Sequence, residues 1–325
     1  MRFVQGEALS STSDYRLMEG KAPDPGPGEV LVRVAACGVG YVDALVALGR
    51  YQVKPPLPYT PGQEAAGWVE ATGDRAQGLA PGDRVMATAR GGFAEFALAP
   101  ATGVVKIPDR MTFAQAAGFR INYLTALHAL RDRAAVQSGE RLLVLGAAGG
   151  VGVAAVQVGK LLGAKVIAAG STEEKRGFAR ANGANLVIDT LVEGWRDRLK
   201  QACDGKGPDV VFDPVCGPLF ELAFRSLVWR GRHLVVGFAG GPIPALPANL
   251  PLMKGAALLG VDVRQFPLFE GERAAAEMSE LLGWVADGRL EPPVGRQFGL
   301  EEFAPALDYA LSGQGMGKTT LAIAE

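Results

Sequence analysis

The most restrictive feature of this 325-residue sequence is a glycine-rich segment, residues 139–160, which reads GERLLVLGAAGGVGVAAVQVGK. An apolar run passes directly into the glycines, and a run rich in Ala, Val and Gln follows them. Small residues at a strand-to-helix turn let the backbone approach a pyrophosphate, while the first free amides of the helix attract its negative charge. The segment therefore predicts a dinucleotide-binding loop. The residues expected to line it are Gly146, Ala148, Gly149, Gly150, Val151 and Gly152.

The usual dinucleotide pattern, G-x-G-x-x-G, is only partly kept, because Ala147 takes the first glycine position while Gly149 and Gly152 hold the other two. Taken alone, such a motif is equally typical of a tight structural turn. Its surroundings favour nucleotide binding, since short apolar runs alternate with helical patterns through this part of the chain. Strands are expected at residues 141–145, 165–168, 185–188, 209–213, 233–237 and 257–261, with helices at 151–162, 173–182, 195–203 and 219–229. This alternation predicts an α/β fold with a doubly wound parallel sheet, the Rossmann arrangement.

The first 115 or so residues have a different texture. Short β-branched runs, such as residues 29–36 and 67–71, are broken by PDPGPG and PPLPYTPG. Strands separated by such turns indicate a compact all-β domain. Beyond about residue 263, a charged helix near 270–287 and a final strand near 318–323 are too short to form a core of their own. We expect this tail to pack on the first domain.

Composition excludes several classes of protein. Lys and Arg number 33 against 34 Asp and Glu, so there is no basic footprint for nucleic acid. Three cysteines and two histidines make a disulfide framework or a four-ligand zinc site improbable, and we expect Cys37, Cys203, Cys216, His128 and His233 to be packed structural residues. Apolar runs stay short of a membrane span, and the first residues lack the apolar core of a secretory signal, so a cytoplasmic protein is expected.

The strand expected at 165–168 ends where an NAD-preferring site places an acidic residue on the ribose 2′-hydroxyl. Here Gly170 stands at about that place and leaves room for a 2′-phosphate. Hydroxyl and cationic side chains follow it, which favours NADPH. The alternative is that residues 173–176 are only the solvated first turn of a helix. The residues expected to form the 2′-phosphate pocket are Gly170, Ser171, Thr172, Lys175 and Arg176.

Together these segments resemble the zinc-independent, zeta-crystallin-like quinone oxidoreductase branch of the medium-chain dehydrogenase/reductase superfamily. The resemblance extends over the whole chain, through GPGEVLVRVAACGVGYVD, PYTPGQEAAGWVEATG and GDRV to the closing GKTTLAI. It implies a GroES-like β domain at residues 1–120, completed by 263–325, and a Rossmann domain at 121–262. It also implies a homodimer formed through the edge strand near 257–261, where a bare apolar edge would be an aggregation hazard.

The resemblance further implies that the nicotinamide lies in a cleft between the two domains. It places Thr125 near the carboxamide and a loop after the fifth strand of the Rossmann sheet against the cofactor. Backbone contacts are implied at the end of the sixth strand. The residues concerned are Gly237, Phe238, Ala239 and Gly240 in the loop, and Val261 and Val263 after the sixth strand.

The resemblance also permits a test for metal. Zinc-dependent members of the superfamily carry a Cys, a His and a further Cys or Asp at positions that here hold Gly40, Gln63 and about Ile121. None of these can bind zinc as those enzymes do, so no metal is expected. Relatives often have Asn where this chain has Gly40. Asp43 and Glu64 lie in family motifs, and we interpret them as residues that order the cleft through hydrogen bonds.

Without a metal, an alcohol has no ready means of losing its hydroxyl proton. A quinone or a conjugated carbonyl can instead accept hydride at carbon, provided that the developing oxyanion receives a hydrogen bond. Tyr41 and Tyr51 are the catalytic candidates, because a phenol can donate to a quinone oxygen and stack on its ring. For each tyrosine, the role of an aromatic core residue explains the sequence equally well.

The resulting prediction is an NADPH-dependent, metal-free and flavin-free reductase acting on a small quinone or α,β-unsaturated carbonyl. One alternative is an enoyl-thioester reductase, since relatives with the same skeleton reduce acyl chains on carriers. Another is an NADPH-binding protein with little turnover, in a structural, regulatory or RNA-associated role. The net charge of −1 gives RNA binding no support.

Overall fold

The computed structural model describes residues 1–324, which form two compact units. Unit 1 comprises Met1–Arg120 and the chain from Leu282 onward, and unit 2 comprises Ile121–Leu281. The chain crosses between the units after Arg120 and after Leu281, whereas the sequence predicts domain boundaries at 120 and 262.

The shifted boundary has a local cause. Helix α9 (Phe266–Phe269) and most of helix α10 (Gly271–Ala286) pack on the π-helical segment His128–Arg133 of unit 2. The Phe266 ring stacks on His128 with the ring centroids 4.0 Å apart, and Arg131 forms a bidentate ion pair with Glu280 at 2.6 and 2.8 Å. Residues 263–281 therefore belong with the α/β unit.

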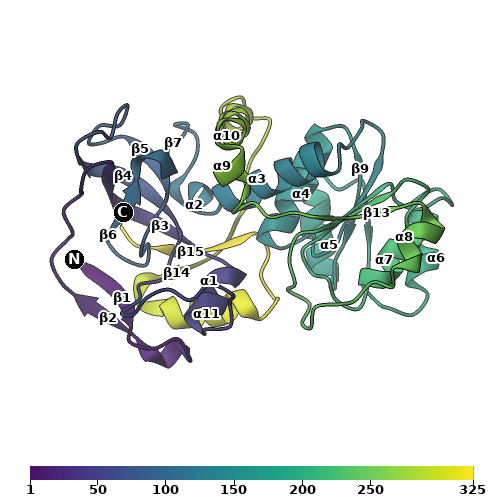
Figure 1. The fold of residues 1–325 in the computed structure, drawn as a ribbon, viewed down its shortest axis with the longest axis horizontal. Coiled ribbons are helices and arrows are strands. Elements are labelled where there is room, and N and C mark those ends of the chain that lie inside the picture. Colours follow the sequence, from purple (N-terminus) through teal and green to yellow (C-terminus); the bar gives the residue numbers. More distant parts are fainter. Residues whose placement is uncertain (325) are drawn as a thin grey trace. The chain divides into compact units, whose positions relative to one another are not determined.

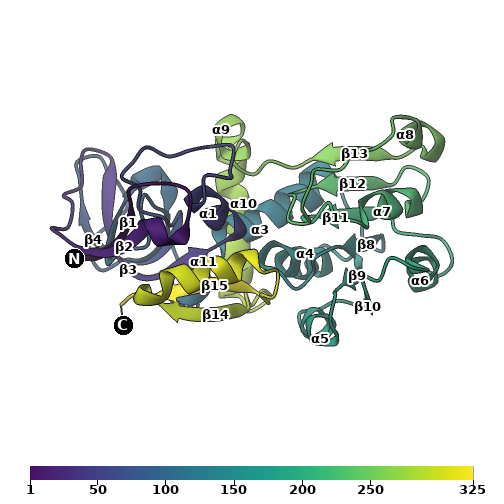
Figure 2. The same ribbon diagram turned by 90° about the horizontal axis from the view of Figure 1, so that it is seen from below.

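Unit 2 is built on a parallel six-stranded sheet in the order β10-β9-β8-β11-β12-β13 (Figure 2). The strands are β8 (Arg141–Val144), β9 (Lys165–Ala169), β10 (Leu186–Ile188), β11 (Val210–Asp213), β12 (Arg232–Val235) and β13 (Ala257–Gly260). The expected strands are thus confirmed. Strands β8, β9 and β11 are largely buried on both faces because helices cover the sheet on either side, and Asp213 is the one buried acidic residue on them.

The helices of unit 2 follow the strands in alternation. In Figure 2, α4 lies on one face of the sheet, and α6 and α7 lie on the other. A buried cluster that includes Trp195, Leu199 and Phe224 fills the latter layer. The helices are α3 (Arg120–Leu127), α4 (Gly150–Leu161), α5 (Glu173–Ala181), α6 (Trp195–Ala202), α7 (Phe220–Ser226) and α8 (Asn249–Lys254).

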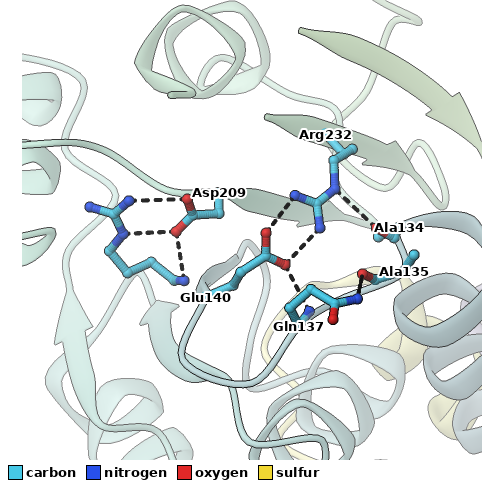
Figure 3. Close-up of polar contacts among 7 residues, drawn as sticks. Ala134, Ala135, Gln137, Glu140, Asp209 and Arg232 are labelled. Atoms are coloured by element: carbon cyan, nitrogen blue, oxygen red, sulfur yellow. Dashed lines mark hydrogen bonds and ion pairs between the residues drawn. The ribbon is translucent and has the colours of Figure 1, made fainter. Parts of the chain in front are cut away.

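Ion pairs connect the N-terminal ends of three of these strands, β8, β11 and β12 (Figure 3). The carboxylate of Asp209 accepts hydrogen bonds from Arg141 Nε at 2.8 Å and Nη2 at 3.0 Å. Glu140 holds the guanidinium of Arg232 at 2.8 and 2.7 Å and also accepts from the backbone amide of Gln137. These charged side chains pair with one another. The C-terminal ends of the strands, which form the opposite edge of the sheet, are therefore the ones available for a ligand.

Unit 1 contains a seven-stranded sheet in the order β14-β15-β3-β4-β5-β7, with β6 paired to β3 (Figure 1). Its strands are β3 (Glu29–Val39), β4 (Glu64–Thr72), β5 (Arg84–Thr88), β6 (Phe96–Pro100), β7 (Val104–Lys106), β14 (Val294–Gly299) and β15 (Lys318–Ala322), and a separate ribbon pairs β1 (Arg2–Gly6) with β2 (Tyr15–Glu19). Short helices are α1 (Tyr41–Ala47), α2 (Phe113–Ala116) and α11 (Phe303–Leu311), with 3₁₀ turns at Thr12–Asp14, Ala101–Gly103 and Leu300–Glu302.

The C-terminal tail completes this sheet, because β15 lies between β14 and the long strand β3. Leu321 and Phe303 enter the same buried cluster as Val34 and Phe93. The fold is therefore the expected α/β protein, a Rossmann-type parallel sheet joined to a GroES-like β unit. Within residues 1–324, no helix is both long enough and apolar enough to cross a membrane.

Candidate functional site

The glycine-rich loop lies where the parallel sheet changes direction. Strand β8 has β9 on one side and β11 on the other, so its C-terminal end is the topological switch point at which such sheets bind ligands. The chain turns at Gly146, whose φ is +58°, and α4 begins at Gly150. A Cβ atom at position 152 would overlap the carbonyl oxygen of Gly146, so only glycine permits this close approach.

The first turn of α4 carries no acidic residue that would repel an anion. Gly149 is the N-cap residue, and as a glycine it supplies no capping side chain of its own. Ala148 and Gly152 are buried, whereas Gly146, Gly149, Gly150 and Val151 are half-buried at the surface of the loop. The six residues predicted to line the loop therefore lie together at the end of β8.

The end of β9 brings a basic side chain onto Gly170. Arg176 donates from Nη1 to the carbonyl oxygen of Gly170 at 2.9 Å and pairs through Nη2 with Glu173 at 2.8 Å. A Cβ atom at position 170 would lie 3.1 Å from Arg176 Cγ, so the absence of a side chain lets the arginine fold over this residue. The guanidinium is thus placed where the sequence predicts a 2′-phosphate.

The other residues of this pocket have different positions. Thr172 is the N-cap of α5, and its hydroxyl accepts a hydrogen bond from the Lys175 amide at 3.2 Å, so capping already uses this side chain. Ser171 is exposed, and Lys175 is half-buried on the first turn of the helix. Of the two predicted cations, Arg176 is the one that lies against Gly170.

Two further loops meet at the same edge of the sheet. The turn after β11 accepts hydrogen bonds from the loop after β12, from the Ala239 amide to Pro214 O at 3.2 Å and from the Gly240 amide to Val215 O at 2.7 Å. The side chains of Pro214 and Val215 also approach Gly146. The predicted residues Gly237, Phe238, Ala239 and Gly240 follow β12, and the Phe238 side chain is 41% exposed.

The remaining predicted cofactor residues are also in unit 2. Val261 and Val263 are half-buried just beyond β13, and the Val261 amide donates to Val235 O at 3.0 Å. Thr125 is buried in α3, where its hydroxyl donates to Ile121 O at 2.6 Å. The Thr125 oxygen thus retains lone pairs with which to accept a hydrogen bond.

Unit 1 contains a buried charge cluster of its own. Lys318 Nζ, at the start of β15, pairs with Glu64 Oε2 at 2.7 Å, and Asp43 Oδ2 accepts from the Gly40 amide at 2.8 Å. Position 40 adjoins both groups, because a Cβ atom there would lie 3.1 Å from Asp43 Oδ2 and 3.2 Å from Lys318 Nζ. Any side chain at position 40 would therefore crowd a carboxylate and an ammonium.

The charges of this cluster shift one another's pKa. Burial raises the pKa of Asp43, although Lys318 opposes the shift. Burial alone would lower the pKa of Lys318, but the carboxylates of Glu64 and Asp43 raise it above its ordinary value. Lys318 therefore stays charged, and it balances two carboxylates that are almost wholly buried.

The predicted catalytic tyrosines lie at the two ends of helix α1. Tyr41 is the first residue of α1, directly after Gly40, and Tyr51 follows the end of that helix; both are half-buried. Tyr59 is bridged through its backbone to Gly6, and burial raises the pKa of its phenol, which keeps it protonated. Both proposed tyrosines are therefore partly accessible to solvent.

Comparison with known proteins agrees with this geometry. Residues 26–109 match the model of the alcohol dehydrogenase GroES-like domain, and residues 150–285 match that of the zinc-binding dehydrogenase. Human quinone oxidoreductase is 36% identical over 313 residues, which cover 95% of this chain and 92% of the human protein. The chain belongs to the quinone oxidoreductase branch of the medium-chain dehydrogenase/reductase superfamily.

Solved structures of related oxidoreductases have the same fold. A probable oxidoreductase from Mycobacterium abscessus is 34% identical, with a TM-score of 0.90 over 99% of this chain and 98% of that one. The quinone oxidoreductase from Thermus thermophilus, also solved as its complex with NADPH, is 30% identical, with a TM-score of 0.85 over 99% of this chain and 100% of that one. This member of the branch is thus an oxidoreductase by family and by fold.

Sequence reasoning did not identify two features of this quinone oxidoreductase-like chain. Lys318 lies in the closing GKTTLAI segment, and its partner Glu64 is 254 positions away, so only the fold shows their pairing. Asp213 closes an apolar strand in the sequence, which gives no sign of its hydrogen bonds to the amides of the following turn. The apolar run that contains His233 gave no sign of a partner for that ring.

The residue types at the positions where zinc-dependent relatives hold metal are poor ligands. Gly40 has no side chain, Ile121 offers only hydrocarbon and Gln63 offers a neutral amide. Within residues 1–324, no group of three or more His, Cys, Asp or Glu side chains is arranged to hold a metal ion. The nearby acidic residues Glu64 and Asp43 are engaged by Lys318 and by the Gly40 amide.

Proposed function

We propose that this protein is an NADPH-dependent, zinc-free reductase that transfers hydride to a quinone or an α,β-unsaturated carbonyl compound. The observation that carries the proposal is the C-terminal edge of the parallel sheet, where the glycine-rich start of α4 and the guanidinium of Arg176 lie at the ends of neighbouring strands. Family membership and the relatives solved with NADPH support it further.

The groups at this edge fit the anionic parts of NADPH. The amides of Gly149–Gly152 would bind the pyrophosphate, because a helix N-terminus favours negative charge. Arg176 and Lys175 would bind the 2′-phosphate, and Gly170 contributes no carboxylate to repel it. Toward the nicotinamide, we assign contacts to Thr125, to the loop 237–240 and to the backbone at Val261 and Val263.

The chemistry assigned to the chain is orientation and charge stabilisation. NADPH bound at this edge would supply a hydride to an electron-poor alkene or quinone carbon, and negative charge would then develop on the substrate oxygen. We assign the hydrogen bond to that oxygen to the phenols of Tyr41 and Tyr51, and a phenol or solvent then supplies the proton. Such a reaction requires no Lewis acid, which agrees with the poor ligands at positions 40, 63 and 121.

We also propose that the protein forms a homodimer through β13. This strand ends the parallel sheet, and one of its edges has no partner strand within residues 1–324. Large apolar side chains are exposed on and near it, with Leu252 at 82%, Met253 and Trp229 at 73% and Leu258 at 40%. A second copy that extended the sheet would satisfy the edge and cover these side chains.

The test is an assay of NADPH and NADH oxidation with 1,4-benzoquinone, 9,10-phenanthrenequinone and an alkenal offered separately, with and without EDTA. Each rate is corrected by an enzyme-free control, because quinones react slowly with reduced nicotinamides unaided. Turnover that prefers NADPH and is insensitive to EDTA is expected. Loss of turnover in EDTA would overturn the zinc-free mechanism, and NADPH binding without turnover would favour a binding protein or a carrier-linked enoyl substrate.

A further inference from the structure

A buried, hydrogen-bonded pair of polar side chains lies beneath the nucleotide edge of unit 2 and is separate from every residue assigned to the cofactor above. His233 Nε2 lies 3.1 Å from Asp213 Oδ2, and both residues are 0% exposed. Asp213 is the last residue of β11, while His233 is the second residue of the neighbouring strand β12. Burying two polar side chains away from water costs free energy, which hydrogen bonds within the protein must offset.

The second oxygen of Asp213 organises the turn that follows it. Oδ1 accepts hydrogen bonds from the amides of Val215 at 2.9 Å and Cys216 at 2.7 Å. Cys216 has a φ of +46°, a left-handed conformation that is unfavourable for a residue with a side chain. The carboxylate thus holds residues 214–216 in a conformation that the backbone alone would rarely adopt.

His233 holds that carboxylate in place. Because Asp213 acts as an acceptor on both oxygens, Nε2 of the ring must carry the hydrogen of their shared bond. Phe220 and Phe224 confine the imidazole, with ring centroids 4.9 and 6.1 Å from it, and Nδ1 has no hydrogen-bond partner among the described residues. Among residues 1–324, Asp213 is therefore the one hydrogen-bond partner of the ring, and the two phenylalanines leave it little freedom to turn.

The turn fixed in this way forms part of the proposed nucleotide site. Val215 Cγ2 would approach within 2.9 Å of a Cβ at Gly146, so the turn packs directly on the glycine-rich loop. The carbonyl oxygens of Pro214 and Val215 accept the amides of Ala239 and Gly240. A shift of the turn would therefore move both loops that the proposed function assigns to the cofactor.

We propose that Asp213 and His233 are a pair of positioning residues for the nucleotide, which shape its site through the turn 214–216. The inference rests on the proposed function, since the nucleotide is taken to bind at this edge. The pair does not touch the reacting atoms, so it should govern affinity for NADPH and leave the hydride step at saturation nearly unchanged.

The experiment compares Asp213→Ala, Asp213→Asn and His233→Phe with Asp209→Ala as the matched control. Asp209 precedes the same strand, β11, and pairs with Arg141 at the opposite edge of the sheet (Figure 3). We expect Asp213→Ala and His233→Phe to raise the Kd and KM for NADPH about tenfold or more, with kcat changed less than about threefold. Asp213→Asn should retain most of the affinity, because its amide oxygen still accepts from the turn and its NH₂ can donate to the ring.

Two measurements, amide hydrogen exchange and nucleotide affinity, distinguish the ways in which the inference could fail. Hydrogen exchange of the Val215 and Cys216 amides, measured without nucleotide, should accelerate in His233→Phe and Asp213→Ala but not in Asp209→Ala. If exchange accelerates while NADPH affinity equals that of the control, the pair is only structural and the inference is wrong. If the unmodified protein binds neither NADPH nor NADH, the proposed function fails, and the nucleotide-positioning role fails with it. If Asp213→Ala does not fold, His233→Phe and Asp213→Asn still decide the question.

Discussion

At position 170, we propose that a missing side chain contributes to the preference for NADPH. Gly170 lets the aliphatic part of Arg176 lie on the end of β9, and the guanidinium is then held by the Gly170 carbonyl and by Glu173. Glu173 is largely exposed, so its pairing with the arginine is weak and exchangeable. A phosphate with nearly two charges would compete successfully for the same guanidinium.

Replacement of Arg176 by Ala should therefore weaken NADPH binding about tenfold or more, because a charge-assisted hydrogen bond is lost, while NADH binding changes little. The measurement is the ratio of kcat/KM for the two cofactors. Arg180→Ala is the control, since this exposed arginine lies on the same helix, α5, beyond its first turn. Equal loss for both cofactors in Arg176→Ala, or the same loss in Arg180→Ala, would contradict the assigned 2′-phosphate pocket.

At the scale of single elements, two helices of unit 2 contain glycine for different reasons. In α4, Gly152 is required because a Cβ would strike the Gly146 carbonyl oxygen. In α5, Gly177 has no atom within 4 Å of the place where its Cβ would be. One glycine is therefore a condition of the nucleotide loop, whereas the other only lowers the stability of its helix.

This contrast predicts opposite outcomes for the same substitution. Gly177→Ala should raise the free energy of unfolding by about 0.5 to 1 kcal/mol, since alanine loses less backbone entropy in a helix. Gly152→Ala should lower it by about 1 to 3 kcal/mol and weaken NADPH binding, because the loop must shift to relieve the contact. Urea unfolding and nucleotide titration of both variants measure these effects. A Gly152→Ala variant with unchanged stability and affinity would show that the close approach is not required.

Helix α10 carries a buried carboxyl group, that of Glu277, shortly before the chain passes into unit 1 at residue 282. Glu277 faces Asp132, which pairs with His128 Nδ1 at 2.8 Å and is also contacted by Arg273. Burial raises the pKa of Glu277 to about 8, and the neighbouring Asp132 adds to the rise, although Arg131 and Arg273 oppose it. Near neutrality this carboxyl therefore holds a proton in the folded protein that an unfolded chain would release.

Stability should therefore fall as the pH rises. Between pH 4.5, the ordinary pKa of Glu, and about 8, the folded state binds a proton that the unfolded state releases. The contribution of Glu277 to stability is thus full below this range and is lost as pH rises through it. The loss should amount to roughly 2 to 4 kcal/mol. Glu277→Gln cannot ionise and should retain this stability at pH 9, whereas at pH 5 it should resemble the unmodified protein.

Urea unfolding at pH 5, 7 and 9 measures the effect as the difference between Glu277→Gln and the unmodified protein, which cancels the titration of other groups. Glu272→Gln is the control, because Glu272 is exposed in the first turn of the same helix. A Glu277→Gln variant whose stability falls between pH 5 and 9 as steeply as that of the control would rule out the assigned proton.

At the scale of the whole molecule, sequence patterns were sufficient where structure is local. The strands β8 to β13 and the nucleotide loop follow from apolar runs and glycines that lie close together in the sequence. The expected boundary at residue 263 differs from the division into compact units at 282, because the packing of Phe266 on His128 and of Glu280 on Arg131 is tertiary. The pairs Lys318 with Glu64 and His233 with Asp213 were missed for the same reason, since partners on different strands leave no periodic signal.

The proposed homodimer forms through the edge strand β13. Its pattern of burial alternates along the strand, and Leu258 is one of its exposed residues. A monomer would present to water both an unpaired strand edge and the apolar side chains of α8, a combination that favours pairing with another chain. Pairing of β13 with its copy across a twofold axis would extend the parallel sheet and bury the patch from both sides.

Leu258→Lys should therefore shift the protein from dimer to monomer, because two copies would bring like charges together across the new interface and leave them without water. Sedimentation velocity at micromolar concentration measures the change. Leu191→Lys is the matched control, since Leu191 is 71% exposed in the segment after β10, at the other end of the sheet order. An unmodified protein that sediments as a monomer, or a Leu258→Lys variant that remains dimeric, would place the interface elsewhere or exclude it.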